Sequence, residues 1–170
     1  SVRVHPAMLP RTHPLASVRG AFNAVFIEGA AAGELMLYGR GAGGAPTASA
    51  VLGDLIDAAH HLRAGSSARR VPRVGARFRP DDDLWCAWYL SIDVADRPGV
   101  LASVARVFGD HGVSIRSMEQ VGLGEEARLI FLTHVARAGD VRRTIEGLRE
   151  LDVVDRVGGV LRIVGDRDDD

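Results

Sequence analysis

At 170 residues the chain is long enough for one or two domains. A hydrophobic content of 46% and a net charge of −1 indicate neither nucleic acid nor an anionic membrane as a partner. All 21 positive side chains are arginine, which excludes a proton-transferring or Schiff-base lysine from this polypeptide. The single cysteine excludes an internal disulfide. With no membrane-length apolar run and no signal-peptide pattern, we expect a cytoplasmic protein.

The sequence pattern of the first forty residues predicts short strands separated by turns. Residues 2–6 alternate like a strand, and a proline-punctuated loop follows them. Residues 15–21 are long enough for one or two helical turns. Residues 23–28 and 34–38 then read as two partner strands joined by a small-residue turn.

A glycine-rich turn follows the second of these strands and opens a helix that ends near Leu62. Gly39, Gly41 and Gly44 satisfy the spacing G-x-G-x-x-G, and Pro46 suits the first helical turn. Such a turn can bring bare backbone N–H groups against a phosphate or cofactor. An ordinary dinucleotide fingerprint also needs an acidic residue about 20 positions later, which is missing here. The alternative is a tight strand-to-helix connection.

The part of the chain up to residue 63 is too small to close a core of its own. Residues 64–84 follow, with Gly65-Ser66-Ser67, two prolines, five arginines and the run Asp81-Asp82-Asp83. Because this stretch mixes opposite charges with Gly, Ser and Pro, we interpret it as a solvated linker.

In residues 85–165 the expected strands and helices alternate with short connections, as they do in a complete domain. Four strands are expected, at 85–94, 113–121, 127–135 and 153–164. A helix follows the first strand and another follows the third, and Asp96 and Asp140 are their expected N-caps. Gly158-Gly159 suggests a bulge in the last strand. The order is βαββαβ, a ferredoxin-like sheet with both helices on one face. Residues 166–170 form an acidic tail.

Two sets of motifs resemble known families. The run Asp96-Arg97-Pro98-Gly99-Val100-Leu101, with a helix closing on His111-Gly112-Val113-Ser114-Ile115, resembles an ACT domain, the amino-acid-sensing module. The first sixty residues resemble the end of the catalytic region of homoserine dehydrogenase. The motifs that match are Val4-His5-Pro6-Ala7-Met8-Leu9-Pro10, His13-Pro14-Leu15-Ala16, Asn23-Ala24-Val25 and residues 39–54.

The resemblance implies an NAD- or NADP-dependent oxidoreductase that interconverts L-aspartate 4-semialdehyde and L-homoserine. The family's nucleotide-binding glycine loop and its catalytic lysine have no counterpart here, so we assign no catalytic residue and expect the chain alone to be inactive. The implied architecture is α+β. Residues 1–63 are expected to be an incomplete catalytic segment whose helix returns to a Rossmann domain. Residues 64–84 are expected to form a linker and residues 85–165 an ACT domain. Residues 166–170 are expected to form an acidic tail.

The resemblance also assigns candidate binding residues. Gly43 is the family's cofactor contact, with Gly41, Ala42 and Thr47 beside it. For an amino-acid effector, with threonine expected, the candidates are Asp96, Gly99, Val100, Leu101, Ser114 and Gln120. The two regions imply a homo-oligomer that assembles through both. No metal site is expected.

Other conspicuous side chains have ordinary structural interpretations. His5 and His13 are read as loop-packing groups, and Asp57, His60 and His61 as a solvated helix end. Cys86 is interpreted as a small hydrophobe, and Trp85, Trp88 and Phe131 as core or interface residues. Two alternatives of another class remain open at this point: a free-standing amino-acid-sensing regulatory protein, and a regulatory tail from another pathway enzyme. Both leave the glycine turn and its helix unexplained.

Overall fold

The computed structural model describes residues 1–65, 75, 77–122 and 126–165, so the tail and residues 66–74 and 76 of the expected linker lie outside the described residues. The chain divides into two compact units. The first unit comprises residues 1–10 and 77–170, and the second unit comprises residues 11–76. Together they give the mixed α+β content that the sequence predicts.

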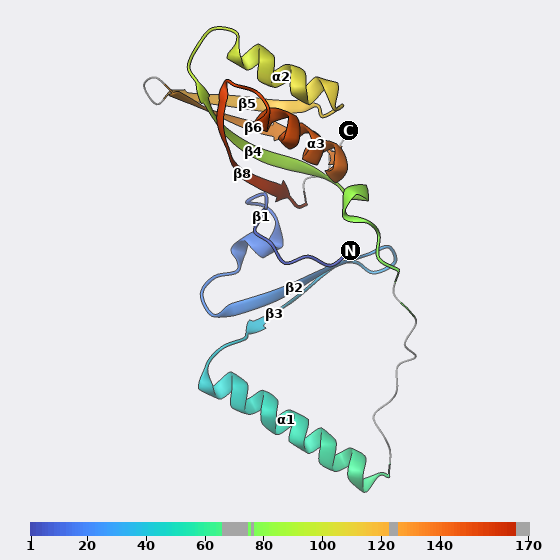
Figure 1. The fold of residues 1–170 in the computed structure, drawn as a ribbon. Coiled ribbons are helices and arrows are strands. Elements are labelled where there is room, and N and C mark those ends of the chain that lie inside the picture. Colours follow the sequence, from blue (N-terminus) through green and yellow to red (C-terminus); the bar gives the residue numbers. More distant parts are fainter. Residues whose placement is uncertain (66–74, 76, 123–125, 166–170) are drawn as a thin grey trace. The chain divides into compact units, whose positions relative to one another are not determined.

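The first unit contains the expected βαββαβ sequence of elements. These elements are β4 (Trp85–Ala95), α2 (Val100–Asp110), β5 (Ile115–Gly122), β6 (Glu126–Thr133), α3 (Ala138–Arg149) and β8 (Val154–Ile163). The four strands pair antiparallel in the order β8-β4-β6-β5. Both helices lie on the same face of this sheet (Figure 1), which confirms the ferredoxin-like expectation.

Alternation along the strands places an apolar row beneath the helices. Leu90, Ile92 and Val94 of β4 are at most 1% exposed and belong to the core cluster. Phe108 of α2 packs on Phe131 of β6 with 4.9 Å between ring centroids. The first unit therefore encloses a hydrophobic core of its own.

A bulge interrupts β8 at the predicted glycine pair. Leu90 pairs with Val160 and Ile92 with Val157, so Gly158 and Gly159 together oppose one residue of β4. A Cβ built on Gly158 would stand 3.2 Å from the backbone oxygen of Ser91. The glycine is needed because the two backbones approach closely there.

The first unit gains one more edge strand from the beginning of the chain. The strand expected at residues 2–6 is wrong: the strand is β1 (Ala7–Met8), which pairs parallel with β8. Val164 N–H donates to the Met8 carbonyl oxygen at 2.9 Å. Pro6 and Pro10 lack the N–H that a longer ladder would need, so they flank a strand of only two residues.

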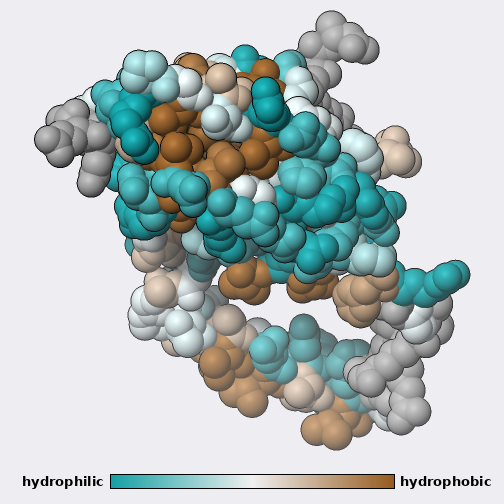
Figure 2. All heavy atoms as spheres, turned by 45° about the horizontal axis from the view of Figure 1, so that its top comes forward, coloured by the Kyte–Doolittle hydropathy of each residue, from teal (hydrophilic) through white to brown (hydrophobic). Residues whose placement is uncertain are grey.

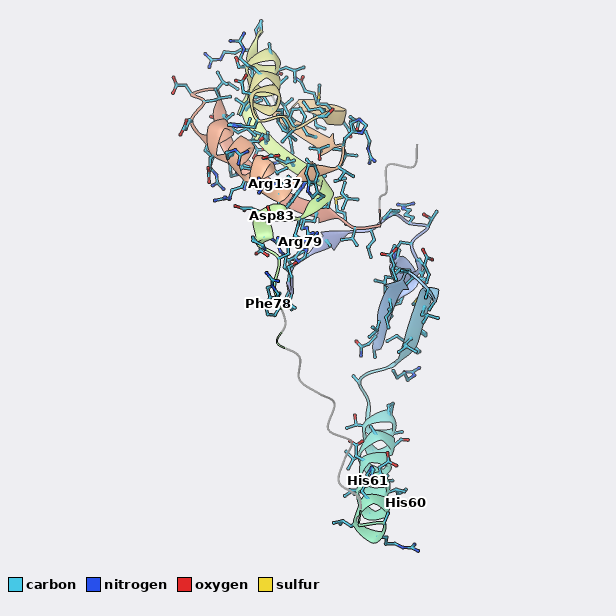
Figure 3. The ribbon with its side chains drawn as sticks, turned by 90° about the vertical axis from the view of Figure 1, so that its right-hand side faces the viewer. His60, His61, Phe78, Arg79, Asp83 and Arg137 are labelled. Carbon is cyan, nitrogen blue, oxygen red and sulfur yellow. The ribbon has the colours of Figure 1, made fainter. Side chains whose placement is uncertain are left out.

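The acidic run at the end of the expected linker is folded onto the first unit. Asp81–Asp83 form the short 3₁₀ helix η2, and each carboxylate pairs with an arginine from elsewhere in the chain. Arg3 lies 3.0 Å from Asp81 and Arg142 lies 2.5 Å from Asp82, while Arg137 pairs with Asp83 (Figure 3). The interpretation of residues 64–84 as a solvated linker is therefore wrong for Asp81–Asp83, which pair with arginines of the first unit.

The expected N-caps Asp96 and Asp140 are both wrong, because the residues that immediately precede α2 and α3 are Gly99 and Arg137. Gly99, with a left-handed φ of +90°, precedes α2, and no side chain caps that helix. α3 follows Arg137, so Asp140 lies in its first turn, where it pairs with Arg143. The two-residue strand β7 (Ala136–Arg137), which the sequence did not predict, pairs with the start of β4.

The second unit consists of a hairpin and one long helix. Its elements are the 3₁₀ helix η1 (Pro14–Ser17), β2 (Phe22–Gly29), β3 (Gly33–Arg40) and α1 (Gly44–Arg63). β2 and β3 pair antiparallel along their full length. The two strands and the long helix are as predicted, whereas η1 is a single short turn that begins before Leu15.

One face of the hairpin is partly covered by the loop that precedes β2, and the other face is exposed to solvent. On the covered face His13 packs edge-on against Phe26 with 4.8 Å between ring centroids. The apolar side chains of the opposite face are 45–66% exposed: Val25, Ile27, Leu35 and Leu37. α1 has no buried residue, and its apolar side chains Val51, Leu52, Leu55 and Ile56 are 53–60% exposed (Figure 2).

The second unit thus presents apolar surface without enclosing a core, as its size predicts. Among the residues that the structure describes, no helix combines the length and the apolar character needed to cross a bilayer.

Candidate functional site

The turn between β3 and α1 depends on glycine at two positions. Gly43 has φ +125° and ψ 151°, a backbone region that residues with a side chain rarely adopt. Gly41 continues the hairpin, since its N–H donates to the Ala21 carbonyl oxygen at 3.2 Å. The chain therefore leaves the hairpin in register and reverses into α1 through Gly43.

The start of α1 presents backbone donors with no acidic side chain beside them. Thr47 N–H closes the first helical turn onto the Gly43 carbonyl oxygen at 3.1 Å. The N–H groups of Gly44 and Ala45 precede that bond and have no partner within the helix. Since the first turn carries no Asp or Glu, the positive end of the helix dipole is not offset by a carboxylate there.

The four residues expected to contact a cofactor lie close together in this turn. Gly41, Ala42, Gly43 and Thr47 are all exposed. Bare backbone at a helix N-terminus suits a phosphate or the edge of a planar ring. The arrangement is compatible with the cofactor contact, which stays a prediction.

A second candidate site lies in the first unit, where β4 turns into α2. A hollow of about 200 Å³ is lined by the turn and by neighbouring strand residues: Val94, Ala95, Asp96, Arg97, Pro98, Gly99, Val100, Leu101, Gln120, Ala127 and Leu129. Its volume is below the range of pockets for drug-sized ligands and suits a ligand the size of one amino acid.

Five of the six expected effector residues line this hollow, and two of them contact each other. Gln120 Nε2 donates to Asp96 Oδ1 at 3.3 Å. The Val100 N–H is already used, because it donates to the Arg97 carbonyl oxygen at 3.3 Å. Arg97 also lines the hollow, and the sequence analysis did not single it out as a binding residue. The signal for it was its position inside the Asp-Arg-Pro-Gly turn.

Comparisons with known proteins find matches for two separate stretches of the chain. Residues 1–56 match the family model described as homoserine dehydrogenase, and residues 88–153 match the ACT domain. Homoserine dehydrogenase of Corynebacterium glutamicum is 44% identical over 98% of this chain and 38% of its own length. That of Mycobacterium tuberculosis is 45% identical over 97% of this chain and 39% of its own length.

The chain matches the C-terminal part of homoserine dehydrogenases. Among solved structures, a homoserine dehydrogenase from Thiobacillus denitrificans superposes with a TM-score of 0.83 and 36% identity, over 95% of this chain and 38% of that one. The chain therefore spans less than half the length of the relatives it matches. These comparisons support a part of the enzyme rather than a free-standing sensor.

Within the ACT domain, the strand register separates Ser114 from the other candidate residues. Asp96 follows Ala95, which pairs with Glu126 at one end of the sheet. Ser114 precedes Ile115, which pairs with Thr133 at the opposite end. The expectation that Ser114 faces the same corner as Asp96 is thus wrong within one chain. A role for Ser114 in effector binding stays a prediction.

On the ACT sheet face away from the helices, Asp93 lies between two arginines. Asp93 Oδ1 accepts from Arg128 Nε at 2.7 Å, and Oδ2 accepts from Arg156 Nη2 at 2.7 Å. The hydrogen bond from Arg128, and then that from Arg156, lowers the pKa of Asp93 below its usual value. The aspartate side chain is 11% exposed, so its charge depends on these two partners.

The remaining conspicuous side chains largely have the structural roles expected of them. His13 Nδ1 accepts from the Leu15 N–H at 3.1 Å, as a loop-packing group would. Trp88 is 8% exposed in the ACT core, whereas Trp85 is 63% exposed and is not a core residue. Cys86 Sγ accepts from Arg162 Nε at 3.3 Å.

The helix end that carries Asp57, His60 and His61 is the last part of α1 (Figure 3). Among the described residues, no three or more His, Cys, Asp or Glu side chains gather closely enough to hold a metal ion.

Proposed function

We propose that this chain is the C-terminal part of an NAD- or NADP-dependent homoserine dehydrogenase, which interconverts L-aspartate 4-semialdehyde and L-homoserine. The observation that carries the proposal is the match of residues 1–56 to that family, in the same chain as an ACT domain. The open apolar face of the second unit supports it, because such a face suits packing against the rest of a catalytic region.

In this proposal the second unit contributes to the cofactor site. Gly43, with Gly41, Ala42 and Thr47, lies against the bound nicotinamide cofactor, and the N-terminus of α1 faces its negative charge. The catalytic proton transfer belongs to a lysine elsewhere in the enzyme, since this chain contains none. Such an enzyme would work in the cytoplasm.

The ACT domain binds an amino-acid effector in the hollow beside Asp96. The Asp96 carboxylate accepts from the ammonium group, and Arg97 with the free N–H groups at the start of α2 binds the carboxylate. Gln120, which contacts Asp96, contributes a further polar group. We propose threonine as the effector, because it is an end product of the pathway that homoserine feeds.

We also propose that the enzyme is a homo-oligomer that assembles through its catalytic region and its ACT domain. Within the described residues β5 pairs only with β6, so its other edge is available for a strand of a second copy. If two β5 edges pair antiparallel, Ser114 of one copy approaches the Gln120 end of the other. This arrangement accounts for the distance of Ser114 from the hollow within one chain.

The proposed activity is tested on the complete enzyme that contains this segment and on the 170-residue chain alone. The complete enzyme is expected to reduce NAD or NADP with homoserine, and the chain alone to give no turnover. In the complete enzyme, Gly43→Ala is expected to raise the cofactor KM about tenfold, because a side chain at that φ costs about 1–3 kcal/mol.

The matched control is Gly109→Ala, a glycine in the ACT helix α2 with open space around it and an ordinary φ. It is expected to leave the cofactor KM unchanged. Turnover by the 170-residue chain alone, or a complete enzyme that does not act on homoserine, would contradict the proposal.

A further inference from the structure

The open face of the hairpin ends in one polar side chain beside the glycine turn. Because side chains alternate along a strand, Asn23 shares this face with Val25 and Ile27. Across the hairpin Asn23 pairs with Gly39. Two residues further along, beyond the pair Phe22–Arg40, the Gly41 N–H donates to the Ala21 carbonyl oxygen. Asn23 is therefore an amide at the end of an apolar surface, opposite two residues that have no side chain.

The Asn23 amide occupies the space that a side chain at Gly41 would need. A Cβ built on Gly41 would stand 1.4 Å from Asn23 Nδ2 and 2.7 Å from its Cγ. A Cβ built on Gly39 meets nothing within 4 Å, although Gly39 is the direct strand partner of Asn23. The side chain of Asn23 thus leans along the strand, over the turn and away from its own partner.

We propose that Asn23 is a positioning residue for the cofactor turn: its amide packs over Gly41 and fixes the path of the backbone from Gly41 to Gly43. This inference rests on the proposed function and adds a residue to the same site. Consecutive glycines leave the turn with wide conformational freedom. A side chain that holds the turn before the cofactor arrives lowers the entropy cost of binding.

The chemistry of the position favours an amide over a space-filling hydrophobe. Asn23 is exposed, and its side chain has no hydrogen-bond partner among the described residues. Its donors and its acceptor therefore remain available at the edge of the turn where a cofactor would lie. The neighbours on the same face, Val25 and Leu37, are apolar and offer no such groups.

The test compares substitutions in the complete enzyme by steady-state kinetics. Asn23→Ala is expected to raise the cofactor KM about tenfold and to leave kcat within about twofold, because the interaction acts on binding. Gly41→Ala is expected to raise the cofactor KM as well, because its methyl displaces the amide and adds bulk where we propose that the cofactor binds. In the double variant the combined effect on the cofactor KM is expected to be smaller than the product of the two single effects, because both substitutions remove the contact between the Asn23 amide and Gly41. Gly39→Ala, the matched control, is expected to change neither constant.

A second readout does not depend on turnover. In the cofactor-free enzyme, hydrogen exchange of residues 41–47 is expected to be faster in Asn23→Ala and unchanged in Gly39→Ala. An enzyme without activity on homoserine would refute the proposed function, and this exchange readout would still decide the role of Asn23. An unchanged cofactor KM in Asn23→Ala, fully additive effects, or unchanged exchange would overturn the inference.

Discussion

Asp93 keeps its charge in a nearly buried position because arginines reach it from both neighbouring strands. Arg128 of β6 and Arg156 of β8 flank it across the sheet, and each donates to a different carboxylate oxygen. Removal of the carboxylate leaves two guanidinium groups facing each other without a counter-charge. The cost belongs to the folded state alone, since the three residues are far apart in the unfolded chain.

We predict that Asp93→Asn lowers the free energy of unfolding at pH 7 by about 1 kcal/mol. This is less than the roughly 1.5–3 kcal/mol usual for hydrogen bonds to charged groups, because the side chains of Arg128 and Arg156 are 40% and 65% exposed to solvent. The pKa of Asp93 is lowered in the folded state. Its stabilisation is therefore present above the unfolded value of about 3.9 and is lost as the pH falls through the lower folded value.

The measurement is urea unfolding of the 170-residue chain at several pH values, followed by tryptophan fluorescence. Both tryptophans, Trp85 and Trp88, lie in the first unit and report on it. The control Asp110→Asn changes an exposed aspartate of α2 and is expected to have little effect. A difference between wild type and Asp93→Asn that stays constant down to about pH 3 would refute the assignment.

At the scale of single residues, the family resemblance assigns the candidate binding residues, and the structure shows the local geometry around them. Gly43 is assigned through the family resemblance, and its φ of +125° in the structure gives the physical reason for a glycine at that position. Asp96 is assigned through the resemblance to ACT domains, and the structure places it in the lining of the hollow. The Asp93 cluster could not be predicted, because it depends on the register of three strands. The contact between Asn23 and Gly41 likewise depends on the register of the hairpin.

The turn from β4 into α2 gathers the groups that an amino acid needs. Asp96 supplies an acceptor, Arg97 a cation and Gly99 the left-handed turn that opens the helix. We predict that threonine binds the 170-residue chain in a calorimetric titration and that Arg97→Ala weakens binding about tenfold or more, since hydrogen bonds to charged groups contribute about 1.5–3 kcal/mol.

Serine, methionine and isoleucine titrated in parallel test the choice of effector. Arg106→Ala is the matched control, because Arg106 is an exposed arginine of α2 outside the lining of the hollow. If none of the four amino acids gave a binding signal, the sensing role would be contradicted. The ACT domain would then serve only as a surface for assembly between copies of the chain. If wild type and Arg97→Ala bound threonine equally well, Arg97 would not be a binding residue of this site.

At the scale of elements, hydrophobic periodicity predicts the long helices and strands and the glycine bulge. It does not predict β1, β7 or η2. These elements are two or three residues long and exist through partners elsewhere in the chain. Arg3 and Asp81, for example, are 78 positions apart. A short segment carries too little pattern of its own to indicate such a contact.

For the whole molecule, the two units differ in what they bury. The first unit encloses its core between one sheet face and two helices. The second unit leaves the apolar residues of α1 and of one hairpin face exposed. The second unit, residues 11–76, is inserted in the sequence of the first unit, which comprises residues 1–10 and resumes at Arg77.

The most direct test of this account is hydrogen exchange of residues 22–63, measured in the 170-residue chain and in the complete enzyme. We predict fast exchange along α1 in the chain alone and strong protection in the complete enzyme with cofactor bound, because packing supplies most of the stability of a helix. β4 is expected to be protected in both. Strong protection of α1 in the chain alone would contradict the claim that the second unit is completed by the rest of a dehydrogenase.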